Sequence, residues 1–331
     1  MTPNRSEDFK RATAFVTGEG PYLVVSHIHP DGDAIGSTLA VGRVLSKLGK
    51  AVVMVNESPV PHKFRFLPGA GEIRSPEEAK SAAPYRRVIA VDVADAERMG
   101  QVRPLLADDA EVLNIDHHPT NDRFGTVNLV EPDAAATAEI LCRWSEGLGV
   151  EWDPSLAACL YTGLLTDTGG FRYSNTTPEV LERASDLLRH GVDPGEVADR
   201  VIETVTREQL AILRRALDTL SFSEQGKVSW MWLTQRDFQE TGAKEEDLDG
   251  IVNYARNVAG VDVGILFRET AEGTVKASLR SREIVDVGEL AQSLGGGGHA
   301  RAAGCNLRGN RKEAERAILD RVAAALRRGG C

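Results

Sequence analysis

Three short apolar runs, each followed closely by Asp or His, limit the fold of this chain more than any other feature. The runs lie at 22–25, 87–91 and 112–115 and are rich in Val and Ile. Continuous apolar runs of this length suit strands that are covered on both faces of a parallel sheet. The loops beyond the strand ends of such a sheet form one crevice, so we expect the polar residues there to converge.

Those polar residues are carboxylates and imidazoles, with no thiolate among them. In chain order they are His27, Asp31, Asp33, Asp92, Asp116, His117 and His118. Asp167 joins them from the end of a helix expected over 156–165, which Asp153 and Pro154 begin as N-cap and first residue. Oxygen and imidazole donors gathered at one place are typical of a divalent-metal site.

Each motif alone also has an ordinary structural interpretation. The spacing His27-x-x-x-Asp31 is common in loops, and an Asp-Gly-Asp sequence at 31–33 is typical of a turn. Asp92 suits a helix N-cap, and 116–119 suits a solvated turn. Because all these groups lie at the ends of expected elements, their combination favours the metal site.

Six candidate ligands are too many for one ion that must also hold substrate. They suit two ions about 3.5–4 Å apart that share one carboxylate. We expect one ion to bind His27, Asp31 and Asp92, and the other to bind Asp33, Asp92, His117 and Asp167. Asp92 is then the bridging ligand.

These groups resemble the four phosphoesterase motifs of the DHH superfamily, which includes the RecJ exonuclease, manganese-dependent inorganic pyrophosphatases and the nanoRNase/phosphoadenosine-phosphate phosphatases. The segment GGGHARAAG at 296–304 resembles the glycine-rich signature of the DHH-associated substrate domain. Segments 249–256 and 278–281 resemble the nanoRNase branch. The resemblance covers nearly the whole chain, and no metal position departs from it.

The resemblance implies roles for two further residues of the Asp-His-His motif. If His117 binds metal, the adjacent ring of His118 points elsewhere, and it is expected to face the scissile phosphate and protonate or hydrogen-bond the leaving oxygen. Asp116 is expected to orient an imidazole. Both are therefore candidate catalytic residues.

The glycine run before His299 has two interpretations. It is typical of a turn or a helix C-cap, but it also lets backbone amides approach a phosphate. With the metal motifs upstream, we favour substrate binding by Gly296, Gly297, Gly298 and His299. Arg280 offers a planar fork for a phosphate or a nucleobase, while Arg268 and Arg256 are weaker candidates, since a lone Arg more often lies in solvent.

The length of 331 residues indicates two domains. We expect an α/β fold with a parallel-sheet DHH metallophosphoesterase domain over 1–192 and a smaller α/β DHH-associated domain over 222–331. Residues 193–221 are expected to form a helical connector, because a cap at 193–196 precedes a long amphipathic stretch.

Charge and cysteine content restrict the partners and the compartment. A net charge of −10 argues against the broad basic surface that binds duplex nucleic acid, but not against a short anionic substrate. No apolar run reaches the ~20 residues of a membrane span, and the charged N-terminus is unlike a signal peptide. Four cysteines without paired spacing suit free thiols in the cytoplasm, with Cys331 exposed.

Together these features predict a cytoplasmic phosphoesterase with two divalent ions, expected to be Mn(II). It would hydrolyse short RNA to mononucleotides, and 3′-phosphoadenosine 5′-phosphate to AMP and phosphate, by attack of a hydroxide held between the ions. A homodimer is left open by the sequence.

Four other functions share some of these features. A class II pyrophosphatase lacks the Gly-Gly-Gly-His segment, and a RecJ-like exonuclease needs more length. A cyclic-dinucleotide or linear-dinucleotide phosphodiesterase is not separated from the nanoRNase by the sequence. The complete ligand set argues against a nucleotide-binding regulator with an inactive site.

Overall fold

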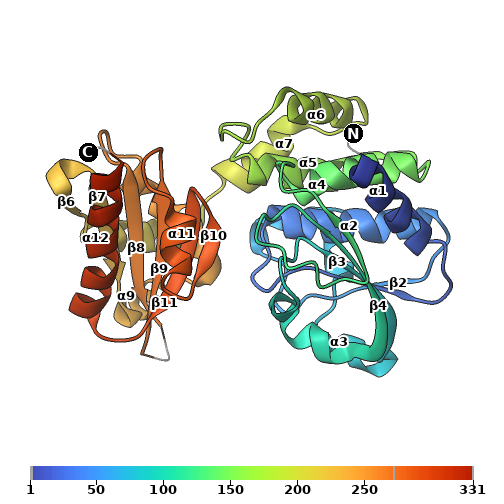
Figure 1. Ribbon diagram of the computed structural model, residues 1–331, viewed down its shortest axis with the longest axis horizontal. Helices are drawn as coiled ribbons and strands as arrows, with labels where there is room; N and C mark the ends of the chain where they lie inside the picture. The colour runs from blue at the N-terminus through green and yellow to red at the C-terminus, as the bar shows by residue number, and fades with distance from the viewer. Residues whose placement is uncertain (1–2, 271–272, 330–331) are drawn as a thin grey trace. The chain divides into compact units, whose positions relative to one another are not determined.

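The computed structural model describes residues 3–270 and 273–329. Contacts divide the chain into a unit that ends at Thr204 and a unit that begins at Val205. The first holds a parallel sheet and the second a mixed sheet, each with its own helices (Figure 1). The predicted α/β fold is therefore confirmed, whereas the bounds of the predicted domains stay a prediction.

The sheet of the first unit has five parallel strands in the order β2-β1-β3-β4-β5. They are β1 (Tyr22–Val25), β2 (Val52–Met54), β3 (Tyr85–Val91), β4 (Leu106–Asp116) and β5 (Val127–Val130). The three apolar runs of the sequence thus form adjacent central strands, and β5 is an edge strand that the sequence did not predict. Because the chain goes from β1 to β2 on one side and to β3 on the other, the crevice lies beyond β1 and β3.

Alternate residues of the strands pack into two hydrophobic layers, one on each face of the sheet. Tyr22 and Val24 of β1 face one layer, and Leu23 and Val25 face the other. The first layer is covered by α2 (Gly32–Lys47), α4 (Thr137–Gly147), α5 (Pro154–Asp167) and α6 (Pro178–Arg189). The second is covered by α3 (Pro76–Ala79) and the 3₁₀ segment η4 (Ala96–Leu105). Because both faces of the sheet are covered, the strands appear in the sequence as continuous apolar runs.

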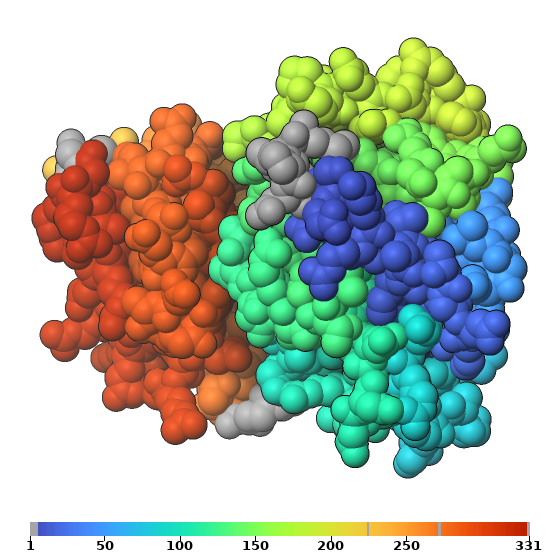
Figure 2. All heavy atoms as spheres, turned by 45° about the vertical axis from the view of Figure 1, so that its right-hand side comes forward, coloured from blue at the N-terminus to red at the C-terminus, as the bar shows by residue number. Residues whose placement is uncertain are grey.

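Smaller elements complete the first unit. They are α1 (Pro3–Phe15), the 3₁₀ turns η1 (His62–Phe64), η2 (Ala70–Glu72) and η3 (Lys80–Ala82), α7 (Pro194–Ala198) and the π-helical turn η5 (Asp199–Glu203). Helix α1 lies beside β5, where Arg11 donates to the carbonyl of Thr126, and it forms the dark blue surface in Figure 2.

The second unit has a six-stranded sheet in the order β10-β11-β9-β8-β7-β6, in which only β7 and β8 are parallel. Its strands are β6 (Ser221–Ser223), β7 (Val228–Leu233), β8 (Val263–Glu269), β9 (Val275–Ser281), β10 (Gly297–His299) and β11 (Ala302–Leu307). Its helices are α8 (Arg207–Leu217), α9 (Gln235–Thr241), α10 (Ile251–Arg256), α11 (Val287–Gln292) and α12 (Arg311–Arg328), with the 3₁₀ turns η6 (Glu224–Gly226) and η7 (Glu245–Leu248).

The stretch over 193–221, predicted as a helical connector, contains α7, η5 and α8. The chain is extended at Thr204 and again at Thr206, which caps α8. Ile212 and Ala216 of α8 are buried against Met231 and Leu233 of the second unit. The amphipathic pattern of α8 therefore reflects packing on β7.

None of the described helices is long and apolar enough to cross a membrane. The described cysteines Cys142, Cys159 and Cys305 are free and buried, and Cys331 lies outside the described residues.

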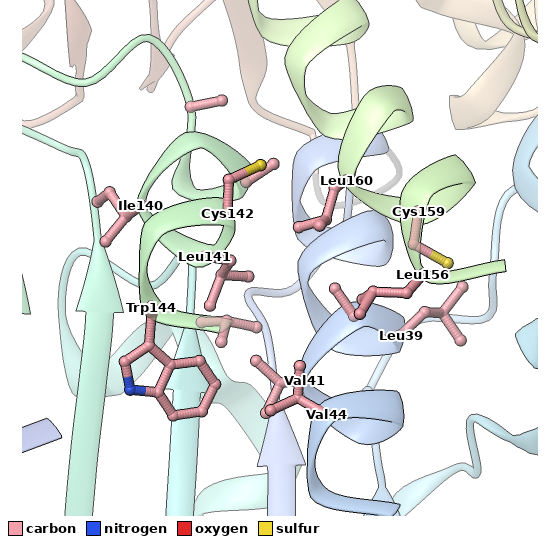
Figure 3. Packing of buried hydrophobic residues seen from close by; sticks show 14 of the residues in the cluster. Leu39, Val41, Val44, Ile140, Leu141, Cys142, Trp144, Leu156, Cys159 and Leu160 are labelled. Carbon is pink, nitrogen blue, oxygen red and sulfur yellow. The ribbon is translucent and has the colours of Figure 1, made fainter. Parts of the chain in front are cut away.

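Two glycines let α2 approach α5 closely. A Cβ at Gly36 would lie 2.5 Å from the carbonyl oxygen of Cys159, and one at Gly163 would lie 2.5 Å from Oδ1 of Asp33. Figure 3 shows Leu39 and Val44 of α2 among side chains of α4 and α5 in this layer. The close packing places Asp33 of α2 against α4 and α5.

We predict that Gly36→Ala destabilises the fold by about 1–3 kcal/mol, because the clashing neighbour is backbone and the helices must separate. Chemical denaturation would measure this change. Gly147→Ala in α4 is the matched control, since no described atom beyond its chain neighbours and its own helix backbone lies within 4 Å of its Cβ position. Equal stability of the two variants would contradict the close-packing argument.

Candidate metal centre

The first motif combines the end of β1 with the start of α2. His27 is buried, and its Nδ1 lies 2.7 Å from the carbonyl oxygen of Ile28. A carbonyl only accepts, so Nδ1 carries the proton and Nε2 is left as the donor for a metal. Asp31 is the N-cap of α2, with Oδ1 accepting the amides of Asp33 and Ala34 at 3.1 Å. The cap fixes the direction in which Asp31 points.

Asp92 follows β3 directly and lies at the centre of the site. Its φ of 60° is in the left-handed region, which a short polar residue such as Asp tolerates better than most. Its Oδ2 is 3.4 Å from Nε2 of His27, and its Oδ1 is 3.6 Å from Nε2 of His117. The two carboxylate oxygens therefore face imidazoles from two different motifs.

The third motif ends β4 and is held by a second carbonyl contact. His117 lies with Nδ1 3.2 Å from the carbonyl oxygen of Ala134, which again leaves Nε2 for the site. That Nε2 is 3.2 Å from Oδ2 of Asp167 at the end of α5. Asp167, the last of the predicted ligands in the chain, is therefore in contact with the centre at His117.

Donor atoms of the predicted ligands form two groups that share Asp92. His27, Asp31 and Asp92 each place one atom within 4.8 Å of the others, as do Asp33, Asp92 and His117. These groups match the two predicted ligand sets, apart from Asp167, which adjoins the second. The set of two imidazoles and four carboxylates fits two hard or borderline divalent cations. The roles of these residues as ligands stay a prediction.

The electrostatics of the centre favour bound positive charge. Burial and the nearby carboxylates of Asp92 and Asp167 raise the pKa of Asp33 well above its usual value, and burial raises the pKa of Asp167 to about 6. Burial alone would lower the pKa of His27 and His117, but the neighbouring carboxylates raise both. For Asp92 burial opposes ionisation, yet the surrounding imidazoles outweigh it and lower the pKa. A divalent cation would displace the protons from such a cluster.

Thr137 is a residue of the centre that the sequence interpretation missed. Its backbone amide donates to Oδ2 of Asp33 at 2.6 Å, and its Oγ1 donates to Oδ1 of Asp92 at 3.1 Å. The amide of Ala138 donates to Oδ1 of Asp33 at 3.0 Å. The N-terminus of α4 thus holds a carboxylate, as helix N-termini commonly do. No local feature of the sequence indicates these contacts, because Asp33 and Asp92 lie 104 and 45 residues from Thr137 in the chain.

His118 has a different environment from His117. The Nδ1 of His118 lies 2.8 Å from Oδ1 of Asp116. The other carboxylate oxygen of Asp116, Oδ2, accepts from Nδ2 of Asn121 at 2.6 Å. Asp116 is fully buried, so it holds the His118 ring in one orientation. The same Nδ1 is 3.6 Å from Oδ1 of Asp92, so the ring lies beside the proposed metal ligands.

In the second unit, three strands align part of the predicted substrate site. Arg280 of β9 is opposite Ala302 of β11, which is opposite His299 of β10. Residues directly opposite in antiparallel strands share a face, so Arg280 and His299 point to the same side. Arg256 of α10 borders this row, because a Cβ at Gly264, opposite Arg280, would lie 2.2 Å from its backbone nitrogen.

Arg268 and the glycine run before His299 also have structural roles in this unit. Arg268 forms an ion pair with Glu245, with Nη2 2.8 Å from Oε2, so it lies in a pair and not on an open surface. The glycine run has structural reasons of its own. Gly295 follows α11 in the left-handed region, and Gly296 and Gly298 lie so close to β11 that a Cβ would reach within 2.5 Å of its carbonyl oxygens.

Two family models match the chain. The DHH family N-terminal domain matches residues 21–164 and the DHHA1 domain matches residues 225–328. A protein of Thermus thermophilus named bifunctional oligoribonuclease and PAP phosphatase NrnA is 40% identical over 94% of this chain and 92% of its own length. A protein of the same name from Bacillus subtilis is 27% identical over 89% of this chain and 91% of its length.

Solved structures support the same fold. The crystal structure of an exopolyphosphatase-related protein from Bacteroides fragilis has a TM-score of 0.88 and 25% identity, covering 97% of this chain and 98% of that chain. RecJ of Thermus thermophilus in complex with Mn²⁺ has a TM-score of 0.54 and 18% identity, covering 97% of this chain and 55% of that chain. The RecJ likeness extends to the fold alone.

We predict that Asp92→Asn removes nearly all turnover and lowers bound metal, because an amide provides one weak oxygen ligand in place of a bridging carboxylate. Elemental analysis after dialysis and a turnover assay would measure both effects. Asn also tolerates the left-handed backbone, so circular dichroism should be unchanged. The control is Asp109→Asn, at an exposed residue. Retention of a tenth of the wild-type rate would refute the bridging role.

We predict that His118→Ala lowers kcat by about 10²–10⁴, the range for a lost acid–base group, with metal content unchanged. The control His190→Ala removes an exposed imidazole of the same unit that is outside the centre and should have no effect. Loss of one metal equivalent in His118→Ala would instead make His118 a ligand.

Proposed function

We propose that this chain, which belongs to the DHH family, is a metal-dependent phosphoesterase that hydrolyses short oligoribonucleotides to mononucleotides and 3′-phosphoadenosine 5′-phosphate to AMP and phosphate. The observation that carries the proposal is the position of Asp92, whose two oxygens face His27 and His117. The names of the relatives support this choice of substrates.

The chemistry proposed for the centre is phosphoester hydrolysis. Two divalent ions, which we propose to be Mn(II), would supply Lewis acidity that activates water and neutralises charge on a phosphoryl group. The protein contributes orientation. Asp92 is fixed by Thr137, and Asp33 by the start of α4, so the oxygen ligands need little reorganisation.

His118 is proposed as the group that serves the leaving oxygen. Because the carboxylate of Asp116 accepts from Nδ1, it orients the ring and leaves Nε2 to exchange a proton with the leaving oxygen. The second unit would recognise the nucleotide through Arg280 and the segment 296–299, with Arg256 beside them. Arg268, held by Glu245, is proposed to shape this surface.

The substrate is proposed to be short and single-stranded. The net charge of −10 provides no broad basic surface for a duplex, so binding depends on the local groups of the site. The free thiols of the described cysteines suit the reducing cytoplasm that we propose as the place of action. A homodimer stays a prediction.

Rates on a panel of substrates test the function. With Mn(II), di- to pentaribonucleotides and 3′-phosphoadenosine 5′-phosphate should be hydrolysed, and rates should fall as the chain lengthens beyond a few residues. A cyclic dinucleotide and pyrophosphate complete the panel. Faster hydrolysis of either of these than of the dinucleotides would overturn the assignment.

We predict that Arg280→Ala raises KM for dinucleotides by about tenfold or more, because a charge-assisted contact to phosphate or base is lost. A generic aryl phosphate ester, which needs only the metal centre, should keep its rate. Arg316→Ala, at an exposed arginine of α12, is the control. Equal losses on both substrates would contradict this division between the units.

A further inference from the structure

A hollow of about 410 Å³ lies in the first unit, between the segment after β2 and the segment before α3. Its volume is within the range of small-molecule sites, roughly 300–1,000 Å³. Val60, Ala70 and Ile73 give it an apolar wall. Asn56, Arg65 and Arg74 are its main nitrogen donors, so it combines an apolar surface with a few polar groups.

Residues that line the hollow form hydrogen bonds with the loop that carries the first metal motif. Oδ1 of Asn56 accepts the backbone amide and the hydroxyl of Ser26, both at 3.1 Å. Oγ of Ser58, which also lines the hollow, accepts the amide of His29 at 3.1 Å. Because Ser26 and His29 flank His27, two lining residues of the hollow are hydrogen-bonded to the loop that carries the first ligand group.

The arginines of the hollow have positive charge to offer a ligand. Nε of Arg65 donates to the carbonyl oxygen of Val60 at 3.1 Å, which directs the rest of its guanidinium. Within residues 3–270 and 273–329 neither Arg65 nor Arg74 forms an ion pair. The lining carboxylates have donors of their own, since Glu57 accepts the amide of Gln101 and Glu78 accepts the amide and hydroxyl of Ser75.

The side-chain amide of Asn56 is the second, independent sign of a ligand. Asn56 is 2% exposed, and its Nδ2 has no hydrogen-bond partner among the residues that the structure describes. A buried donor without an acceptor costs free energy, which a ligand oxygen would recover. The Nδ2 group and the two guanidinium groups are donors, and Glu57 and Glu78 already accept from protein donors, so an acceptor with negative charge suits the hollow.

We propose that this hollow is a subsite for a second phosphate of the substrate, at the RNA linkage next to the one that reacts. The inference rests on the proposed function and deepens it. Guanidinium groups match a phosphodiester oxygen pair, and the apolar wall suits the adjoining sugar. The subsite gives the first unit its own preference for substrates with at least two linkages.

The test compares ApA, which has one linkage, with ApApA, which has two. In the wild type ApApA should have about tenfold higher kcat/KM, the contribution of a charge-assisted contact. The double variant Arg65→Gln/Arg74→Gln should lose this advantage and keep the wild-type rate on ApA. The control variant Arg86→Gln/Arg103→Gln removes two arginines that are ion-paired elsewhere in the unit and should keep the advantage.

Binding separates the subsite from the proposed function. Isothermal titration of ApApA into chelator-treated protein should show about tenfold weaker binding in the Arg65/Arg74 variant than in the wild type. If the wild type hydrolyses no RNA but still binds ApApA about tenfold more tightly than the variant does, the subsite is supported and the proposed function is wrong. Equal preference for ApApA in variant and wild type, or a parallel loss on ApA, would overturn the subsite.

Discussion

The carboxylate of Asp92 is the contact on which the rest of the site depends. It follows a buried strand in a left-handed conformation and directs one oxygen to His27 and the other to His117. This is possible because β1, β3 and β4 are neighbours in the sheet, so three separate motifs end at one edge. The parallel sheet is thus the reason that residues as far apart in the chain as His27 and His117 could act on one phosphate.

Helix packing supplies the rest of the arrangement. Gly36 and Gly163 allow α2 to lie against α5, and this brings Asp33 to the amides at the start of α4. The helix start offsets part of the cost of burying that carboxylate. The same Thr137 contacts Asp92, so α4 holds ligands of both proposed ions.

Much of this could be predicted from the sequence, because strand runs and the residues after them are local signals. The run at 22–25 forms β1, the runs at 87–91 and 112–115 lie within β3 and β4, and the helix expected over 156–165 lies within α5. The role of Thr137 could not be predicted, since its partners lie 104 and 45 residues away in the chain. Likewise, nothing near Arg268 indicates its pairing with Glu245, and the glycine run gives no local sign of its contact with β11.

The central claim is that two ions share Asp92, and anomalous diffraction from crystals grown with Mn(II) tests it most directly. The account predicts two peaks about 3.5–4 Å apart, one beside His27 and Asp31 and the other beside Asp33 and His117, with Asp92 between them. A single peak at full occupancy, or two peaks that do not share Asp92, would contradict it.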